Sequence, residues 1–235
     1  TGELEPDHGE VRRPANFFVS QLGGSSANIA VSLTKLGCKC HLLTCVSDDA
    51  LGKLAVKQLN VLGVNTSFIR FIKGDVRISF SVVETTIKNH QSIIFRNGAA
   101  DLMMDTQDIN KINFNNFSCL IFTGTCLTSE PSRSATFQAI NFAKEKGLPI
   151  IFDIDYRPYI WKSLNETSEI YLKTVKLCDV IIGNDEEFGI VSGSYEKGIN
   201  IAENLSHSSK IAIYKMGEKG SIIFFENKII KTGVF

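Results

Sequence analysis

Two carboxylates and an arginine directly follow a short apolar segment in the middle of the chain. The segment, residues 148–152, has the β-branched composition of a buried strand in a parallel sheet. Asp153, Asp155 and Arg157 come next, shortly before the only tryptophan, Trp161. Ligands of open α/β sheets bind beyond the carboxyl ends of the strands. These charges therefore either form one wall of a polar site or pair with each other at an ordinary strand end, and both readings stay open.

A second arginine, Arg96, follows an expected strand at residues 91–95. Arg96 and Arg157 come from separate elements, and two such guanidinium groups could bind one carboxylate through bidentate, charge-assisted hydrogen bonds. The alternative is a surface salt bridge for each arginine, and the pattern alone favours that alternative.

A glycine pair, Gly23 and Gly24, precedes an amphipathic helical pattern that ends at Gly37. Glycines at the start of a helix let backbone amides approach a ligand, and the helix dipole favours oxygen-rich or anionic groups. Asn28, one turn into the helix, can both donate and accept, as a sugar hydroxyl requires. A tight turn before a helix would look the same. The spacing matches neither a dinucleotide fingerprint nor a Walker A loop.

Two further polar groups follow expected strands nearer the end of the chain. Asn184 and Glu187 come after a strand at 180–182, and amide and carboxylate oxygens there could hold Mg²⁺ through its waters. An acidic first helical turn is the alternative, since the helix dipole favours it. Lys215 and Gly217 form a turn that needs no function as part of a hairpin, but beside a nucleotide it would bring a cation and free amides to phosphates.

Composition narrows the class of protein. The 235 residues are 43% hydrophobic, and 25 basic residues balance 25 acidic ones, which argues against broad nucleic-acid binding. No apolar run is long enough to span a bilayer and no signal peptide is evident, so we expect a cytoplasmic protein without a membrane partner. The six cysteines form no C-x-x-C pair and the four histidines have no zinc-ligand spacing, so we expect reduced thiols.

Strands and helices alternate along most of the chain. This order predicts a three-layer α/β/α sandwich with a mainly parallel sheet, formed by residues 23–73 and 99–235. Two strands at 77–85 and 91–95, joined by a turn at 87–90, interrupt the alternation. We expect residues 1–22 and 74–98 to form a small β lid over the site. Its exposed strand edge would permit pairing with the lid of a second copy in a homodimer.

The ordered set of motifs resembles the ribokinase-like (PfkB) carbohydrate kinases. Gly23-Gly24-x-x-x-Asn28-x-Ala30 is similar to the first signature of that family. Asn184-x-x-Glu187 is similar to its N-x-x-E element, and Lys215-x-Gly217-x-x-Gly220 to its late strand–turn element. Each motif is loose, but their order and spacing agree from Gly23 onwards, which makes the set specific.

The resemblance implies phosphoryl transfer from ATP with Mg²⁺ as cofactor. Asn184 and Glu187 would organise Mg²⁺ and its waters. Asn184, Lys215 and Gly217 would lie on the nucleotide side. The implied ligands are thus ATP and a small-molecule sugar, with no nucleic acid.

Within the family, Asp153-Ile154-Asp155-Tyr156-Arg157-Pro158-Tyr159-x-Trp161 resembles the 5-dehydro-2-deoxygluconokinases of myo-inositol catabolism. Thr123-Gly124-Thr125 and Ser129-x-Pro131-Ser132-Arg133 resemble the same subgroup. The 2-keto-3-deoxygluconate kinases carry a related D-x-N-x-R-x-x-x-W motif and are the nearest alternative. Both substrates are acidic sugars.

This subgroup implies a set of substrate-binding residues. Gly24 and Asn28 would hold sugar hydroxyls. Arg96 and Arg157 align with positions that hold the substrate carboxylate, and Phe80 on the hairpin would line the same pocket. The implied reaction converts 5-dehydro-2-deoxy-D-gluconate to its 6-phosphate.

The chain also departs from the family pattern. Ser26 stands where Gly, Ala or Pro is usual, and Ser47 where Gly is common. The family's G-A-G-D segment, which supplies an anion hole and the Asp that accepts the hydroxyl proton, does not occur in the sequence. We therefore assign no catalytic residue, expect the C-terminal part of the fold to be absent, and expect residues 1–235 alone to be inactive. A non-catalytic, sugar-binding regulatory protein of the same family is the rival class.

Overall fold

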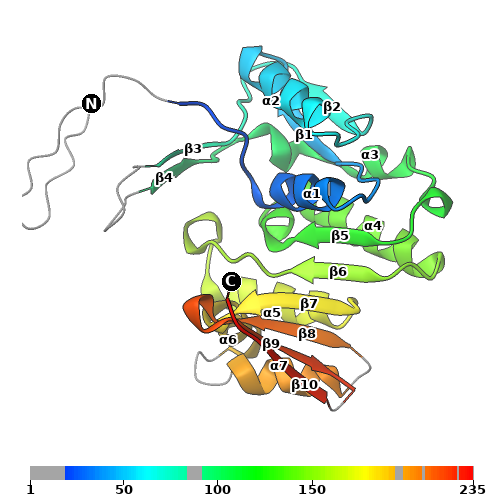
Figure 1. Cartoon of the computed structure of the whole chain (residues 1–235). Coiled ribbons are helices and arrows are strands. Elements are labelled where there is room, and N and C mark those ends of the chain that lie inside the picture. Colours follow the sequence, from blue (N-terminus) through cyan, green and yellow to red (C-terminus); the bar gives the residue numbers. More distant parts are fainter. Residues whose placement is uncertain (1–18, 84–91, 194–197, 208–209, 227, 235) are drawn as a thin grey trace, which may run out of the picture.

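A six-stranded sheet forms the centre of the molecule (Figure 1). The computed structural model describes residues 19–83, 92–193, 198–207, 210–226 and 228–234. The strand order is β10-β9-β8-β7-β6-β5. The bounds are β5 (Leu120–Thr123), β6 (Ile150–Asp153), β7 (Val180–Asn184), β8 (Ile211–Lys215), β9 (Ser221–Phe225) and β10 (Lys228–Thr232). Strands β5 to β8 run parallel and the last two pairs are antiparallel, so the predicted α/β fold with a mainly parallel sheet is confirmed.

Four helices cover one face of this sheet (Figure 1). They are α4 (Ser132–Glu145), α5 (Leu164–Val175), α6 (Asp185–Ser192) and α7 (Gly198–Ser206). The apolar side of α4, predicted from its spacing, is buried at Ala135, Ala139, Ile140 and Ala143. These side chains share one core with Phe152, Ile181, Ala212 and Phe224 of the strands. Burial of each large apolar side chain contributes roughly 1.5–3 kcal/mol.

The opposite face of the sheet is covered unevenly. Ser26 of α1 (Ser25–Lys35) contacts Thr123 of β5 from this side, which makes the expected third layer at that end of the sheet. Further along, buried and partly exposed residues alternate on β7, β8 and β9. The partly exposed row includes Ile182, Ile213 and Ile223, which are paired by register, and Ile230 of β10, 52% exposed, continues it. Among the described residues, no helix packs on this part of the face (Figure 1).

A second unit lies beside β5 (Figure 1). Its two parallel strands are β1 (Thr44–Ser47) and β2 (Ile69–Ile72), joined by α2 (Ala50–Val61). The short helix α3 (Thr106–Asn110) follows later in the chain and packs against α4.

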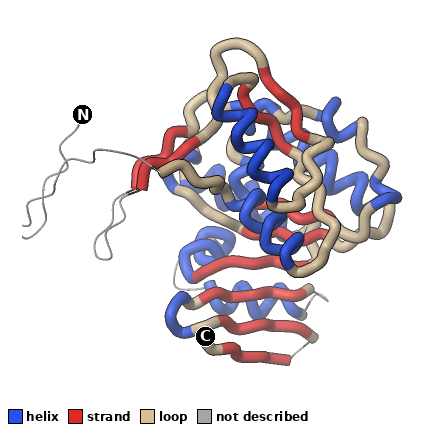
Figure 2. Tube along the Cα trace, turned by 45° about the horizontal axis from the view of Figure 1, so that its top comes forward, coloured by secondary structure: helices blue, strands red, loops and turns tan. Residues whose placement is uncertain are grey.

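The hairpin stands apart from both sheets (Figure 2). It consists of β3 (Phe80–Val83) and β4 (Ser92–Phe95), paired antiparallel with Phe80 opposite Phe95. Both predicted strands exist; β3 begins at Phe80 rather than at residue 77, and the predicted strand residues 84, 85 and 91 lie outside the described residues. The predicted turn at 87–90 and residues 1–18 of the predicted lid region lie outside the described residues, so the division into core and lid stays a prediction.

All six cysteines are free thiols; Cys45 and Cys178 are buried, and Cys38 is exposed. In the described parts of the chain, every helix falls short of the length and hydropathy needed to cross a membrane.

Candidate functional site

Polar side chains gather where the parallel strands of the sheet end. Thr123 and Asp153 are register partners at the ends of β5 and β6, and Asn184 and Lys215 are partners at the ends of β7 and β8. All four residues lie on the same face because ladder partners point to one side of a sheet. The sequence predicted that Asp153 borders a polar site and that Asn184 and Lys215 lie together on a nucleotide side, but it did not predict that Asp153 joins the other two.

Asp155 connects two segments that are far apart in the sequence. Its carboxylate accepts a hydrogen bond from the hydroxyl of Ser25, at the start of α1, and its Oδ1 lies 2.7 Å from Nη2 of Arg157. Asp155 is buried and has φ of 39°, a left-handed conformation that is uncommon outside glycine and stores of order 1–3 kcal/mol. The two contacts hold this conformation in place. They bring the glycine-rich start of α1 to the end of β6.

Arg96 is held tightly by the protein itself. Its Nε and Nη2 donate to Oδ2 of Asp101 at 2.9 and 2.6 Å, and Nη2 also donates to the Thr125 carbonyl at 3.0 Å. The Arg96 side chain is only 12% exposed. Arg157 is 46% exposed, and besides Asp155 it contacts the carbonyl of its own neighbour Tyr156. Most donors of Arg96 are therefore in use, whereas Arg157 keeps donors for a ligand.

Tyr159 is close enough to both arginines for their charges to act on its hydroxyl group. Burial raises the pKa of Tyr159, and the positive charges of Arg157 and Arg96 both oppose that rise. Each arginine also forms an ion pair with a carboxylate, as the alternative interpretation of separate salt bridges predicted. We call Arg96, Arg157, Asp101 and Asp155 the arginine side of the site.

The start of α1 lies next to the arginine side. Gly24 has φ of 101°, which suits glycine, and a Cβ built there would meet no atom within 4 Å, so the space in front of it is open. The Asn28 amide donates to the Gly24 carbonyl in the first turn. The unusual Ser26 packs its hydroxyl 3.3 Å from that of Thr123. Phe80 lies further out, stacked on Phe95 of the hairpin with ring centroids 4.7 Å apart.

On the other side of the site, two carboxylates share one lysine. Nζ of Lys215 lies 3.3 Å from Oδ1 of Asp153 and 3.8 Å from Oε2 of Glu187. Burial raises the pKa of both carboxyl groups, and the nearby Lys215 only partly offsets this. We call Asp153, Glu187 and Lys215 the lysine side.

Glu187 also has a structural role. One of its carboxylate oxygens accepts the Tyr156 amide at 3.1 Å and the other accepts the Asn184 amide at 2.7 Å. The Asn184 side chain in turn accepts the Glu187 amide, which completes a capping box at the start of α6. Glu187 is almost fully buried, so this geometry fits contact with waters of a hydrated Mg²⁺ better than direct ligation. Among the described residues, no three His, Cys, Asp or Glu side chains are arranged to hold a metal by themselves.

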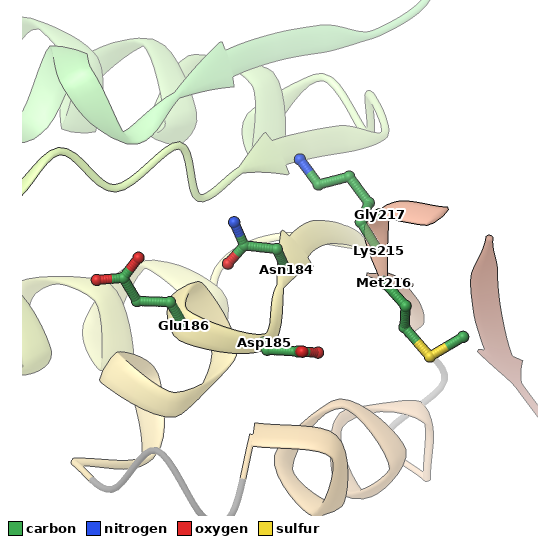
Figure 3. Close-up of a pocket in the computed structure, with 6 residues that line it drawn as sticks. All are labelled: Asn184, Asp185, Glu186, Lys215, Met216 and Gly217. Carbon is green, nitrogen blue, oxygen red and sulfur yellow. The ribbon is translucent and has the colours of Figure 1, made fainter. Parts of the chain in front are cut away.

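A pocket of about 350 Å³ opens beside the lysine side (Figure 3). It is lined by Asn184, Asp185, Glu186, Lys215, Met216 and Gly217. Figure 3 shows the Asn184 and Lys215 side chains pointing to one side, while Met216 points the opposite way. Three of the predicted residues, Asn184, Lys215 and Gly217, therefore meet at one pocket.

The family model for pfkB family carbohydrate kinases matches residues 3–232. The chain belongs to this family. It is 34% identical over 223 residues to the 5-dehydro-2-deoxygluconokinase of Geobacillus kaustophilus, covering 92% of this chain and 67% of that protein. It is 36% identical over 212 residues to the enzyme of the same name from Clostridium perfringens, covering 88% and 63%. The chain thus spans about two thirds of the length of these relatives.

Among solved structures, this pfkB-family chain is similar to aminoimidazole riboside kinase from Salmonella enterica, solved with aminoimidazole riboside and an ATP analog. The TM-score is 0.79 and the identity is 20%, with 95% of this chain and 72% of the other covered. At this identity the similarity establishes the shared fold.

Several residues that build the site were not identified from the sequence. Asp101, Ser25 and Thr123 were not singled out as site residues, and Asp153 and Asp155 were proposed as a possible wall of a polar site without assigned roles. The spacing of Asp153 and Asp155 after a buried strand was a usable signal. Asp101 gave no such signal, because a separation of five residues from Arg96 matches the periodicity of neither a helix nor a strand.

Proposed function

We propose that this protein transfers the γ-phosphoryl group of ATP to an acidic keto sugar, 5-dehydro-2-deoxy-D-gluconate, and forms its 6-phosphate. The observation that carries the proposal is the arginine side: a half-exposed Arg157 with unused donors follows β6, and both its charge and that of the fixed Arg96 act on Tyr159. Two guanidinium groups there suit a substrate carboxylate. The relatives named above support the choice of sugar.

The substrate would lie between the start of α1 and the arginine side. In this proposal Arg157 binds the carboxylate directly and Arg96 adds its positive charge from a fixed position. Gly24 and Asn28 bind sugar hydroxyls, since the space before Gly24 is open. Phe80 would cover the pocket from the hairpin. Selection of acidic over neutral sugars would then depend mainly on Arg157.

The nucleotide would lie at the pocket beside the lysine side. Asn184, Lys215 and Gly217 would contact its phosphates, and Mg²⁺ would neutralise charge on the phosphates when bound. Asn184 and Glu187 would hold waters of the ion. Asp153 keeps Lys215 in place at the strand ends. Positioning and charge neutralisation supply most of the rate enhancement in this chemistry.

No catalytic residue is assigned among residues 1–235, because the G-A-G-D segment is not in the sequence. We therefore expect these residues alone to be inactive. Measurable turnover by residues 1–235 would refute the role given to that segment.

The test is an assay of ADP formation by the intact gene product. Mg-ATP is supplied with 5-dehydro-2-deoxygluconate, 2-keto-3-deoxygluconate, fructose or ribose in turn. Preference for the first sugar supports the proposal, and preference for the second keeps the mechanism but changes the substrate. Turnover of neutral sugars only would overturn the assignment of the arginine side. No turnover at all would favour a regulatory, sugar-binding protein.

Arg157→Ala is the matched variant for this assay. Its KM for the acidic sugar should rise steeply, while any neutral sugar that is turned over should be affected less. Equal losses on both kinds of sugar would remove the carboxylate assignment.

A further inference from the structure

Arg133, in the first turn of α4, contacts both segments that support the arginine side. Its side chain is 20% exposed, and the proposed function gives it no role. One of these segments is the loop at 125–128, which contacts Arg96. The other is the turn at 158–161, which directly follows Arg157.

The first set of contacts fixes the loop. Arg133 Nε donates to the Leu127 carbonyl at 2.7 Å, and its Nη2 donates to the Thr128 carbonyl at 3.0 Å. Arg96 also donates to the Thr125 carbonyl at 3.0 Å and lies 3.5 Å from the Thr128 hydroxyl. The loop is therefore bound by both arginines. Together with Asp101, it determines where the guanidinium of Arg96 lies.

The second set of contacts lies at the turn after Arg157. The guanidinium carbon of Arg133 lies 6.0 Å from the centre of the Trp161 ring, at the outer limit of a cation–π contact. Trp161 is buried and packs edge-on against Tyr171, with ring centroids 5.2 Å apart. Its amide closes the turn by donating to the Pro158 carbonyl. The carboxylate of Glu166 lies 2.9 Å from Nη2 of Arg133 and compensates the positive charge of the guanidinium group.

We propose that Arg133 is a positioning residue that sets the spacing of Arg96 and Arg157 for the substrate carboxylate. This inference rests on the proposed function. A carboxylate that binds Arg157 within reach of the Arg96 charge needs the two guanidinium groups at a fixed separation, and binding geometry tolerates errors of only about 0.5 Å. Arg133 can serve both segments because its planar group donates in several directions and stacks on a ring. A lysine has a compact charge and cannot make all these contacts at once.

The experiment compares Arg133→Lys with Glu166→Gln in the intact protein. Glu166→Gln removes the ion pair but leaves the two carbonyl bonds and the tryptophan contact. Arg133→Lys should raise KM for 5-dehydro-2-deoxygluconate about tenfold, with kcat and the KM for ATP nearly unchanged, because only the carboxylate geometry is altered. Glu166→Gln should stay within about twofold of the wild type. Equal rises in both KM values, or no rise, would overturn the proposal.

Hydrogen exchange gives a second readout that needs no activity. Without sugar, Arg133→Lys should speed exchange in the peptides covering 125–128 and 157–161 alike, while Glu166→Gln should change neither. Acceleration confined to 125–128 would contradict the coupling. If the wild type turns over no acidic sugar, the proposed function fails, and the exchange result still decides whether Arg133 couples the two segments.

A second variant covers the case in which Arg133→Lys does not fold. Trp161→Phe keeps the bonds between Arg133 and the loop and weakens the stacking on the turn. It should raise the KM for the acidic sugar in the same direction by a smaller factor. An unchanged KM in Trp161→Phe would show that the turn does not depend on this contact and would overturn the proposal.

Discussion

The arginine side and the lysine side of the site balance their charges differently. On the arginine side each cation has its own carboxylate, with Arg96 and Asp101 at 2.6 Å and Arg157 and Asp155 at 2.7 Å. On the lysine side the partly buried Asp153 and the buried Glu187 share Lys215 at 3.3 and 3.8 Å. The arginine side is thus compensated before any ligand binds, whereas the lysine side has an excess of negative charge. Such an excess suits a site that receives a cation.

The two arginines also differ from each other. Arg96 has little exposed surface and four contacts with Asp101, Thr125 and Thr128. Arg157 has nearly half of its side chain in solvent. A cation that the fold itself holds should matter mainly for stability, and a cation with free donors should matter mainly for binding. The following predictions test these contrasts, beginning with the largest expected effect.

Arg96→Ala should lower the free energy of unfolding by about 3 kcal/mol, because it leaves the Asp101 carboxylate without its cation. Oδ1 of Asp101 is already buried without a hydrogen-bond partner in the described structure. Urea unfolding of the variant and the wild type measures the difference. Arg77→Ala is the control, since Arg77 is exposed and, within the described part of the chain, its side chain donates to the backbone carbonyls of Gly74 and Val76. A loss below about 1 kcal/mol would make Arg96 an ordinary surface ion pair.

Arg157→Lys should leave stability within about 1 kcal/mol of the wild type, because the lysine still compensates Asp155. In the intact protein it should raise the KM for the acidic sugar about tenfold, since an ammonium cannot form the planar pair of hydrogen bonds. Steady-state kinetics and thermal unfolding measured on the same preparation separate the two effects. A large loss of stability with an unchanged KM would reverse the roles given to the two arginines.

Asp153→Asn should raise the free energy of unfolding at neutral pH by about 1 kcal/mol, because it replaces a charge that burial disfavours by a neutral amide. Burial raises the pKa of Asp153 above 3.8, so the folded protein binds this proton more tightly than the unfolded chain. Stability from this group is therefore lost as the pH rises from 3.8 through the raised pKa. Across that range, the unfolding midpoint of the variant should rise relative to that of the wild type as the pH increases. A variant that is less stable at every pH would mean that the ion pair with Lys215 outweighs burial.

Local patterns in the sequence were sufficient for most of the fold. The spacing of Ala135, Ala139 and Ala143 identified the buried side of α4, and the apolar run at 148–152 identified β6. The glycine pair and the N-x-x-E motif likewise located the starts of α1 and α6. These features depend on neighbours within about one helical turn, which a single sequence displays directly.

The rest of the site depends on contacts between distant residues. Asp155 and Ser25 are 130 positions apart, and no local sequence pattern predicts the left-handed backbone conformation of Asp155 that brings them together. Glu187 does lie in the acidic first turn of α6, as the alternative interpretation had it, but the sequence could not show that its carboxylate also accepts the backbone amide of Tyr156, 31 positions away. The sequence likewise could not show that Arg96 is buried by the loop at 125–128.

The partly uncovered row of Ile182, Ile213, Ile223 and Ile230 has a practical consequence for work with residues 1–235. Contiguous apolar surface of this kind promotes self-association of a protein in solution. Salts such as ammonium sulfate strengthen apolar association and should precipitate these residues early, whereas a mild non-ionic detergent should keep them dispersed. A dye whose fluorescence increases on binding to apolar surfaces should bind to this row in the native state, before any unfolding begins.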